Sequence, residues 1–226
     1  MNAQQKTEQI NLDDPEPRWP AVVALVAVGG LYEALPKSLQ WGPRGLLISL
    51  VVLLIIPTVL TRRRGHHGLN RILGLSVDVV VTAFLIVSLG LLVRALLGGH
   101  IQPAQLLRSS AALWLTNVLV FALWYWQFDG GGPHQRDLRG EHTDGAFLFP
   151  QMAMSSQIKR ETGEQGWDPN FLDYLFLAFN TSTALSPTDT AVLSRWAKVL
   201  MMLQALISLT VIVLLAARAV NILNPS

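Results

Sequence analysis

The sequence predicts an all-α membrane protein with four or five transmembrane helices and one re-entrant, pore-like helix. Hydrophobic residues make up 51% of its 226 residues, and charged residues make up only 14%. The hydrophobic residues gather in long runs, and about 20 such residues span the ~30 Å hydrocarbon core of a bilayer. One further segment near the carboxyl end is too short to cross, and it ends in a hydroxyl-rich turn. That order of elements is typical of a re-entrant loop.

The chain begins with a polar, acidic-leaning arm, residues 1–18. The arm lacks the basic start and the cleavage site of a signal peptide, and we expect it to be disordered.

A transmembrane helical region is predicted for residues 19–128. Its four apolar runs cover approximately residues 19–35, 45–60, 73–97 and 104–128. The first run contains Gly29 and Gly30 and barely reaches the length of a span, so the number of spans is four or five. The fourth run closes with Trp124, Tyr125 and Trp126, an aromatic belt where a helix meets the lipid headgroups.

Three polar residues inside these runs are expected to have structural roles. Asp78 and Arg94 lie near opposite ends of the third run, and both are expected to reach the membrane interface. Asn117 lies in the middle of the fourth run, where a hydrogen bond to another helix explains it without a transport role.

Residues 129–170 open with three glycines and carry mixed charge, which predicts a solvated loop. A metal site is the disfavoured alternative there, because the spacing fixes no coordination geometry for His134, Asp137, Glu141, His142 and Asp144. An apolar patch, Phe147 to Pro150, is expected to dock on the membrane surface or on neighbouring helices.

The last region, residues 171–226, is predicted to hold the re-entrant helix, a loop and a final transmembrane helix. The short helix is expected to start near Asp168 and Pro169, a favoured cap and first-turn pair. Its carboxyl end would direct Thr181 and Thr183 inward, where the negative end of the helix dipole stabilises a cation.

The final helix is predicted to run from the interface at Arg195 and Trp196 to about Leu223. Its polar residues Gln204, Ser208 and Arg218 fall on one face, which is expected to line a bundle interior or a water-filled path.

Residues 114–223 resemble the two-helix pore module of tetrameric potassium-type channels. The family pattern F-L-D-x-L-Y/F-x-x-F-x-T-x-T-T-V-G-Y-G-D is similar to this chain at Phe171, Leu172, Asp173, Leu175, Phe176, Phe179, Thr181, Thr183 and Asp189. The filter departs from the family, because T-V-G-Y-G is replaced by Ala184, Leu185, Ser186, Pro187 and Thr188. Both glycines are gone and proline fixes φ near −65°, so potassium selectivity is not expected. The same segment is also similar to a bacterial membrane-protein family of unknown function, which names no activity.

Two functions therefore stay open. The first is a poorly selective cation pore lined by Thr181, Thr183, Ser186, Thr188, Asp189 and Gln204. For this function the resemblance implies monovalent cations and a homotetramer. For either function we expect an integral protein of the bacterial inner membrane. The second is a non-conducting membrane scaffold or partner-binding subunit, in which the loop only caps a helical bundle.

Other functional classes receive little support. The chain has no cysteine, which excludes disulfides, thiolate metal sites and cysteine nucleophiles. The net charge is +2 and the basic residues lie mostly between apolar runs, so nucleic-acid binding is not expected. The sequence contains no Gly-rich phosphate loop and no nucleophile elbow, so we predict neither an enzyme nor a cofactor. The expected surroundings are the lipid bilayer.

The charges and the resemblance disagree about orientation. Arg62, Arg63, Arg64 and Arg71 in a short connection predict that this connection is cytoplasmic. The loop 129–170 then lies on the same side, whereas a potassium-type pore needs its loop outside. Both orientations stay open.

Overall fold

The computed structural model describes residues 16–63, 67–98, 102–139, 145–186 and 189–223, and these are mostly helical. The elements in chain order are α2 (Trp19–Glu33), η1 (Lys37–Leu39), α3 (Leu46–Arg63), α4 (His67–Leu97), α5 (Pro103–Phe128), η2 (Asp129–Gly131), α6 (Pro133–Arg139), β1 (Phe147–Leu148), α7 (Pro150–Ala153), α8 (Ser156–Thr162), α9 (Phe171–Thr183), β2 (Ala191–Val192) and α10 (Arg195–Leu223).

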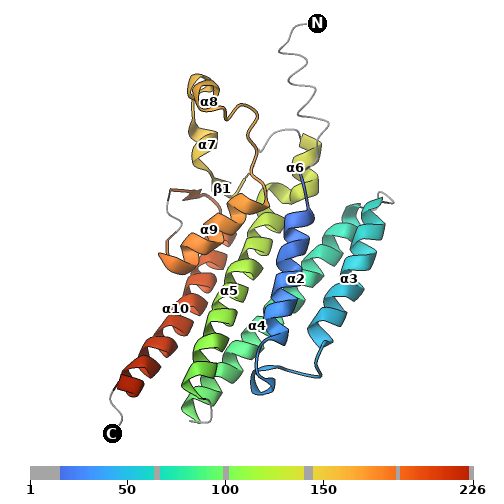
Figure 1. Cartoon of the computed structure of the whole chain (residues 1–226). Coiled ribbons are helices and arrows are strands. Elements are labelled where there is room, and N and C mark those ends of the chain that lie inside the picture. The colour runs from blue at the N-terminus through green and yellow to red at the C-terminus, as the bar shows by residue number, and fades with distance from the viewer. Residues whose placement is uncertain (1–15, 64–66, 99–101, 140–144, 187–188, 224–226) are drawn as a thin grey trace, which may run out of the picture.

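The long helices form one bundle around α5, which contacts α2, α4, α9 and α10, while α3 packs mainly on α4 (Figure 1). Within the described residues, three helical stretches are long and apolar enough to cross a membrane, at residues 68–97, 104–138 and 195–216. The apolar helices α2 and α3 are shorter, with 15 and 18 residues. The chain is therefore a helical protein with the features of an integral membrane protein.

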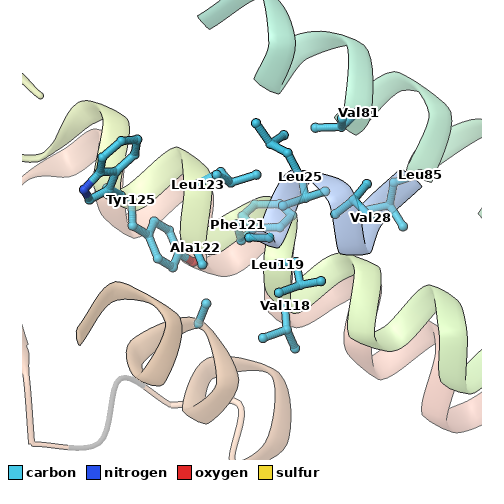
Figure 2. Packing of buried hydrophobic residues seen from close by; sticks show 14 of the residues in the cluster. Leu25, Val28, Val81, Leu85, Val118, Leu119, Phe121, Ala122, Leu123 and Tyr125 are labelled. Carbon is cyan, nitrogen blue, oxygen red and sulfur yellow. The ribbon is translucent and has the colours of Figure 1, made fainter. Parts of the chain in front are cut away.

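The core lies where α2 and α4 meet α5. Leu25 and Val28 from α2 lie beside Val81 of α4 and Phe121 of α5 (Figure 2). Helix α5 is buried on most sides because it lies between the other helices. The outer helices instead expose large aliphatic side chains, such as Leu206 and Val213 of α10, as helices surrounded by lipid do.

The helix boundaries confirm most of the sequence-based segments. Helices α2, α3, α5 and α10 fall on the expected runs, but α4 begins at His67 rather than near residue 73. The hydropathy pattern missed this start because the first turn of α4 is polar. The position predicted for Asp78 at the interface is wrong, because this residue is 4% exposed and lies on the face of α4 that meets the bundle. No described residue forms an ion pair with it.

The segment after α5 differs from the solvated loop expected for residues 129–170. It contains the short elements η2, α6, β1, α7 and α8. Phe147 and Phe149 are 1% and 4% exposed, and their rings pack on Tyr125 and Tyr174. The apolar patch thus docks on neighbouring helices, one of the two expected outcomes. Aromatic packing makes this segment a cover over the α5 and α9 ends of the bundle.

Candidate functional site

Helix α9 begins with a reciprocal capping box. Asn170 Oδ1 accepts a hydrogen bond of 2.9 Å from the backbone N–H of Leu172, and Asp173 Oδ2 accepts one of 2.8 Å from the backbone N–H of Asn170. The predicted start near Asp168 and Pro169 is therefore wrong by about two residues. The box satisfies two amide donors that the first turn of a helix leaves without partners.

One face of α9 is buried against α5 and α10. The buried residues follow helical spacing and are Phe171, Tyr174, Leu177, Ala178, Thr181 and Ser182. Leu172 is 66% exposed, so it lies on the outward face of α9. Phe179 is 45% exposed, and its ring meets Trp114 edge-on. This face packs against α10 because Ala178 and Ser182 are small and let α10 come close.

A hydrogen-bonded cluster, fully buried, joins α9 to α5 and α10. We call it the Gln204 network, and it comprises Gln204, Tyr125, Ser182 and the carbonyl of Ala178. Gln204 Nε2 donates to Ala178 O at 2.7 Å and to Ser182 Oγ at 2.8 Å. Gln204 Oε1 accepts a hydrogen bond from the Tyr125 hydroxyl. Gln204 therefore holds three helices together from within the bundle.

Asn117 adds a second contact between α5 and α10. Its Nδ2 donates to Ser208 Oγ at 2.8 Å and to the backbone carbonyl of Gln204 at 3.2 Å. This confirms the expected packing role of Asn117. Gln204 and Ser208 do share one buried face of α10, which is the bundle-interior alternative of the prediction. The side chain of Arg218 lies outside the described residues.

An open groove of about 620 Å³ lies between the end of α9 and the first half of α10. The predicted pore residues Thr181, Ser186 and Asp189 line it, and Lys198 of α10 lines it too. Leu185 at its edge has a φ of 54°, which is a strained conformation for a side chain that is not glycine. The groove thus gathers hydroxyl groups and one charge of each sign.

The other predicted pore residues are placed differently. The Thr183 side chain is exposed, and its hydroxyl donates to Phe179 O at 2.9 Å. Thr188, together with Pro187, lies outside the described residues. Gln204 lies behind the groove in the contact of three helices, so the pore-lining role predicted for it is not supported.

The chain after the groove is tied to the cover. Strand β2 pairs antiparallel with β1, with Phe147 opposite Val192 and Leu148 opposite Ala191. The backbone N–H of Leu193 also donates to Ala146 O at 2.8 Å. The chain therefore enters α9 and returns from it at the same end of the bundle (Figure 1).

A second buried polar cluster lies at that end, where α5, α6 and α9 meet. The Asp129 carboxylate accepts hydrogen bonds from the Tyr174 hydroxyl at 2.7 Å and from the backbone N–H of Ala146. Arg136 donates to the carbonyls of Asp129 at 2.7 Å and Trp126 at 2.9 Å, and its guanidinium lies 5.2 Å from the centre of the Tyr174 ring. These contacts fix the first turns of α9 on the end of α5.

The last residues of the predicted disordered arm are part of this cluster. Glu16 pairs with Arg136 at 2.7 Å and accepts a hydrogen bond from the Trp126 indole. Arg18 pairs with Asp137, also at 2.7 Å. The disorder expected up to residue 18 is thus wrong for residues 16–18, and residues 1–15 lie outside the described residues. Burial raises the pKa of Glu16, although Arg136 and Trp126 counteract this in part.

Sequence reasoning missed this cluster because its members are distant in the chain. The one available signal was Asp129, an acid that directly follows the aromatic belt of α5. For the disfavoured metal site, Glu141, His142 and Asp144 lie outside the described residues. In the described part of the chain, no group of three or more potential metal ligands comes together.

Comparison with protein-family models, with curated proteins and with solved structures found no match for this chain.

Proposed function

We propose that the chain is a channel-like membrane subunit in which α9 is a re-entrant helix and the groove residues form the mouth of a poorly selective cation pore. The observation that carries this proposal is the return of the chain to β1 after α9. Helix α9 has 13 residues, which reach only ~20 Å, whereas the hydrocarbon core is ~30 Å thick. A segment of this length, entered and left at one end, fits a re-entrant helix.

In this proposal the membrane contains more than the three long helices. Helix α3 has 18 residues, about 27 Å, and its exposed aliphatic side chains suit lipid. Helix α2 is shorter and packs on α5, so the number of spans is four or five. The resemblance to potassium-type channels supports a homotetramer, and the bacterial inner membrane is a further part of the same proposal.

The charges in the groove support weak selectivity. Asp189 would attract cations to the mouth, while Lys198 in the same groove would repel them. The chain lacks the filter glycines, and the Thr183 hydroxyl donates a hydrogen bond to Phe179 O. No ring of backbone carbonyls comparable to a potassium filter is therefore expected from this segment.

Orientation is a further part of the proposal. Arg71 and His134 line one cavity, so the arginine-rich connection and the cover lie at the same end of the bundle. The positive-inside rule then favours a cytoplasmic cover, and a potassium-type pore favours the opposite. We propose the cytoplasmic side, because four arginines in one short connection outweigh an analogy whose filter is absent.

Cation flux into vesicles tests the proposed pore. The full chain, reconstituted in proteoliposomes, should carry potassium and sodium at similar rates. Asp189→Asn keeps the side-chain size and removes the charge, so it should lower flux most at low ionic strength. The matched control is Glu161→Gln, an exposed acid of α8 remote from the groove. Equal flux for both variants in low salt would remove Asp189 from the ion path.

The second candidate is a non-conducting scaffold, and the Gln204 network favours it. Gln204 and Ser182 direct their polar groups into the contact between α10 and α9 rather than toward an open path, and the Thr181 hydroxyl donates to Leu177 O of its own helix. A folded oligomer that passes no cation in the same vesicles would favour the scaffold over the pore.

A further inference from the structure

A cavity of about 310 Å³ lies between α2, α3, α4 and α5, at the same end of the bundle as the cover. It is separate from the groove beside α9 and shares no lining residue with it. One wall is aliphatic and includes Val22 of α2 with Ile55 and Val59 of α3. Val22 and Val59 are 42% and 43% exposed, so this wall continues into the outer surface of the bundle.

The rim of the cavity is cationic. Arg18, at the start of α2, and Arg71, in the first turns of α4, both line it, and His134 of α6 completes this side. Asn70 and Gln127 add neutral hydrogen-bonding groups. Among the described residues that line the cavity, none is aspartate or glutamate. The cavity therefore joins an apolar wall formed by α2 and α3 to positive charge at the end of the bundle.

Arg18 and Arg71 both have guanidinium donors that an anion could use. One terminal guanidinium nitrogen of Arg18 pairs with the Asp137 carboxylate. The Nε of Arg18 is buried and has no hydrogen-bond partner in the described part of the chain. Arg71 is exposed and forms no ion pair with any described residue. A buried donor without an acceptor costs free energy, and an anionic oxygen in the cavity would provide that acceptor.

We propose that this cavity binds the phosphate headgroup of an anionic phospholipid from the surrounding leaflet, with an acyl chain along the aliphatic wall. Basic pockets between transmembrane helices favour anionic headgroups, at ~1 kcal/mol for each arginine or lysine near the surface. The continuity of the aliphatic wall with the outer surface favours a lipid over a free phosphate ion. The site does not depend on whether the chain conducts ions.

Glycine at position 68 gives a way to close the cavity. Gly68 lines it, and a Cβ added there meets no atom within 4 Å. Gly68→Leu should therefore fill the space without a clash at its first carbon. Gly90 of the same helix also has open space around its Cβ position, but it does not line the cavity. Gly90→Leu is thus a matched control.

The test measures lipid retention by native mass spectrometry of the full chain in a neutral detergent, with phosphatidylglycerol and phosphatidylcholine as probes. The wild-type protein should retain phosphatidylglycerol in preference to phosphatidylcholine. Arg71→Gln should weaken that binding ~5-fold, which corresponds to the loss of one basic contact. Arg94→Gln, at the far end of α4, should leave it unchanged. Gly68→Leu should reduce retention, and Gly90→Leu should not.

Three results would overturn the proposal. The first is equal retention of the two lipids by the wild-type protein. The second is equal loss in Arg71→Gln and Arg94→Gln, which would mean general attraction of lipid to surface arginines. The third comes from thermal unfolding of the protein with each ligand. If millimolar inorganic phosphate raises the unfolding temperature as much as phosphatidylglycerol does, the site belongs to a free anion.

Discussion

Replacing Gln204 by leucine should destabilise the bundle by about 3 to 4 kcal/mol. The change removes three side-chain hydrogen bonds, to Ala178 O, Ser182 Oγ and the Tyr125 hydroxyl. Hydrogen bonds between membrane helices contribute ~0.6 kcal/mol each on average, which gives about 2 kcal/mol. The Tyr125 hydroxyl is also left buried without its acceptor, at a further ~1 to 2 kcal/mol. Leucine is close to glutamine in size, so no cavity adds to the cost.

A double-mutant cycle separates this network from general packing. Tyr125→Phe removes the hydroxyl that Gln204→Leu leaves buried without an acceptor. The double variant should therefore be ~1 to 2 kcal/mol more stable than the sum of the two single effects predicts. Equilibrium unfolding in mixed micelles of neutral detergent and dodecyl sulfate, followed by tryptophan fluorescence, measures each free energy. Gln165→Leu in an exposed turn is the control. If Gln204→Leu unfolds within ~0.5 kcal/mol of the wild-type protein, the network does not hold α9 in place.

Three further predictions concern the ends of α9 and the proposed pore. Asn170→Ala removes the helix cap and should cost ~1 kcal/mol of unfolding free energy, and no loss would contradict the capping role. Burial raises the pKa of Glu16 above its ordinary 4.5, so its contribution to stability is full below pH 4.5 and is lost as pH rises through the folded-state pKa. Thermal unfolding of Glu16→Gln should show a weaker pH dependence there, and an unchanged one would refute this. If vesicles show current, a reversal potential at the potassium equilibrium value would refute weak selectivity.

The helices were predictable because hydropathy and length carry most of the signal. Runs of aliphatic residues located the ends of α2, α3, α5 and α10 to within about three residues. The start of α4 was missed because its first turn is polar, and hydropathy does not distinguish a polar helical turn from a loop. The capping box of α9 was present in the sequence as Asn170 and Asp173, but the neighbouring Asp168 and Pro169 are an equally common start signal.

The environment of the polar residues was less predictable. A helical wheel places Gln204 and Ser208 on one face, yet it does not say whether that face meets water or another helix. The contact with Ser182 and Asn117 decides this, and it depends on how α9 and α5 pack. The cluster around Asp129 joins segments up to 158 residues apart, from Glu16 to Tyr174, and no local pattern encodes such a contact.

The central proposal, that α9 enters and leaves the membrane on one side, is tested most directly by cysteine labelling. The chain has no cysteine, so single cysteines at the exposed positions Asp168 and Asp189 can be labelled without background. A cysteine at Gln102, at the other end of the bundle, marks the opposite side. In sealed vesicles of known orientation, a membrane-impermeant maleimide should label positions 168 and 189 from one side and position 102 from the other. Labelling of 168 and 189 from opposite sides would show that α9 crosses the membrane and would contradict the account.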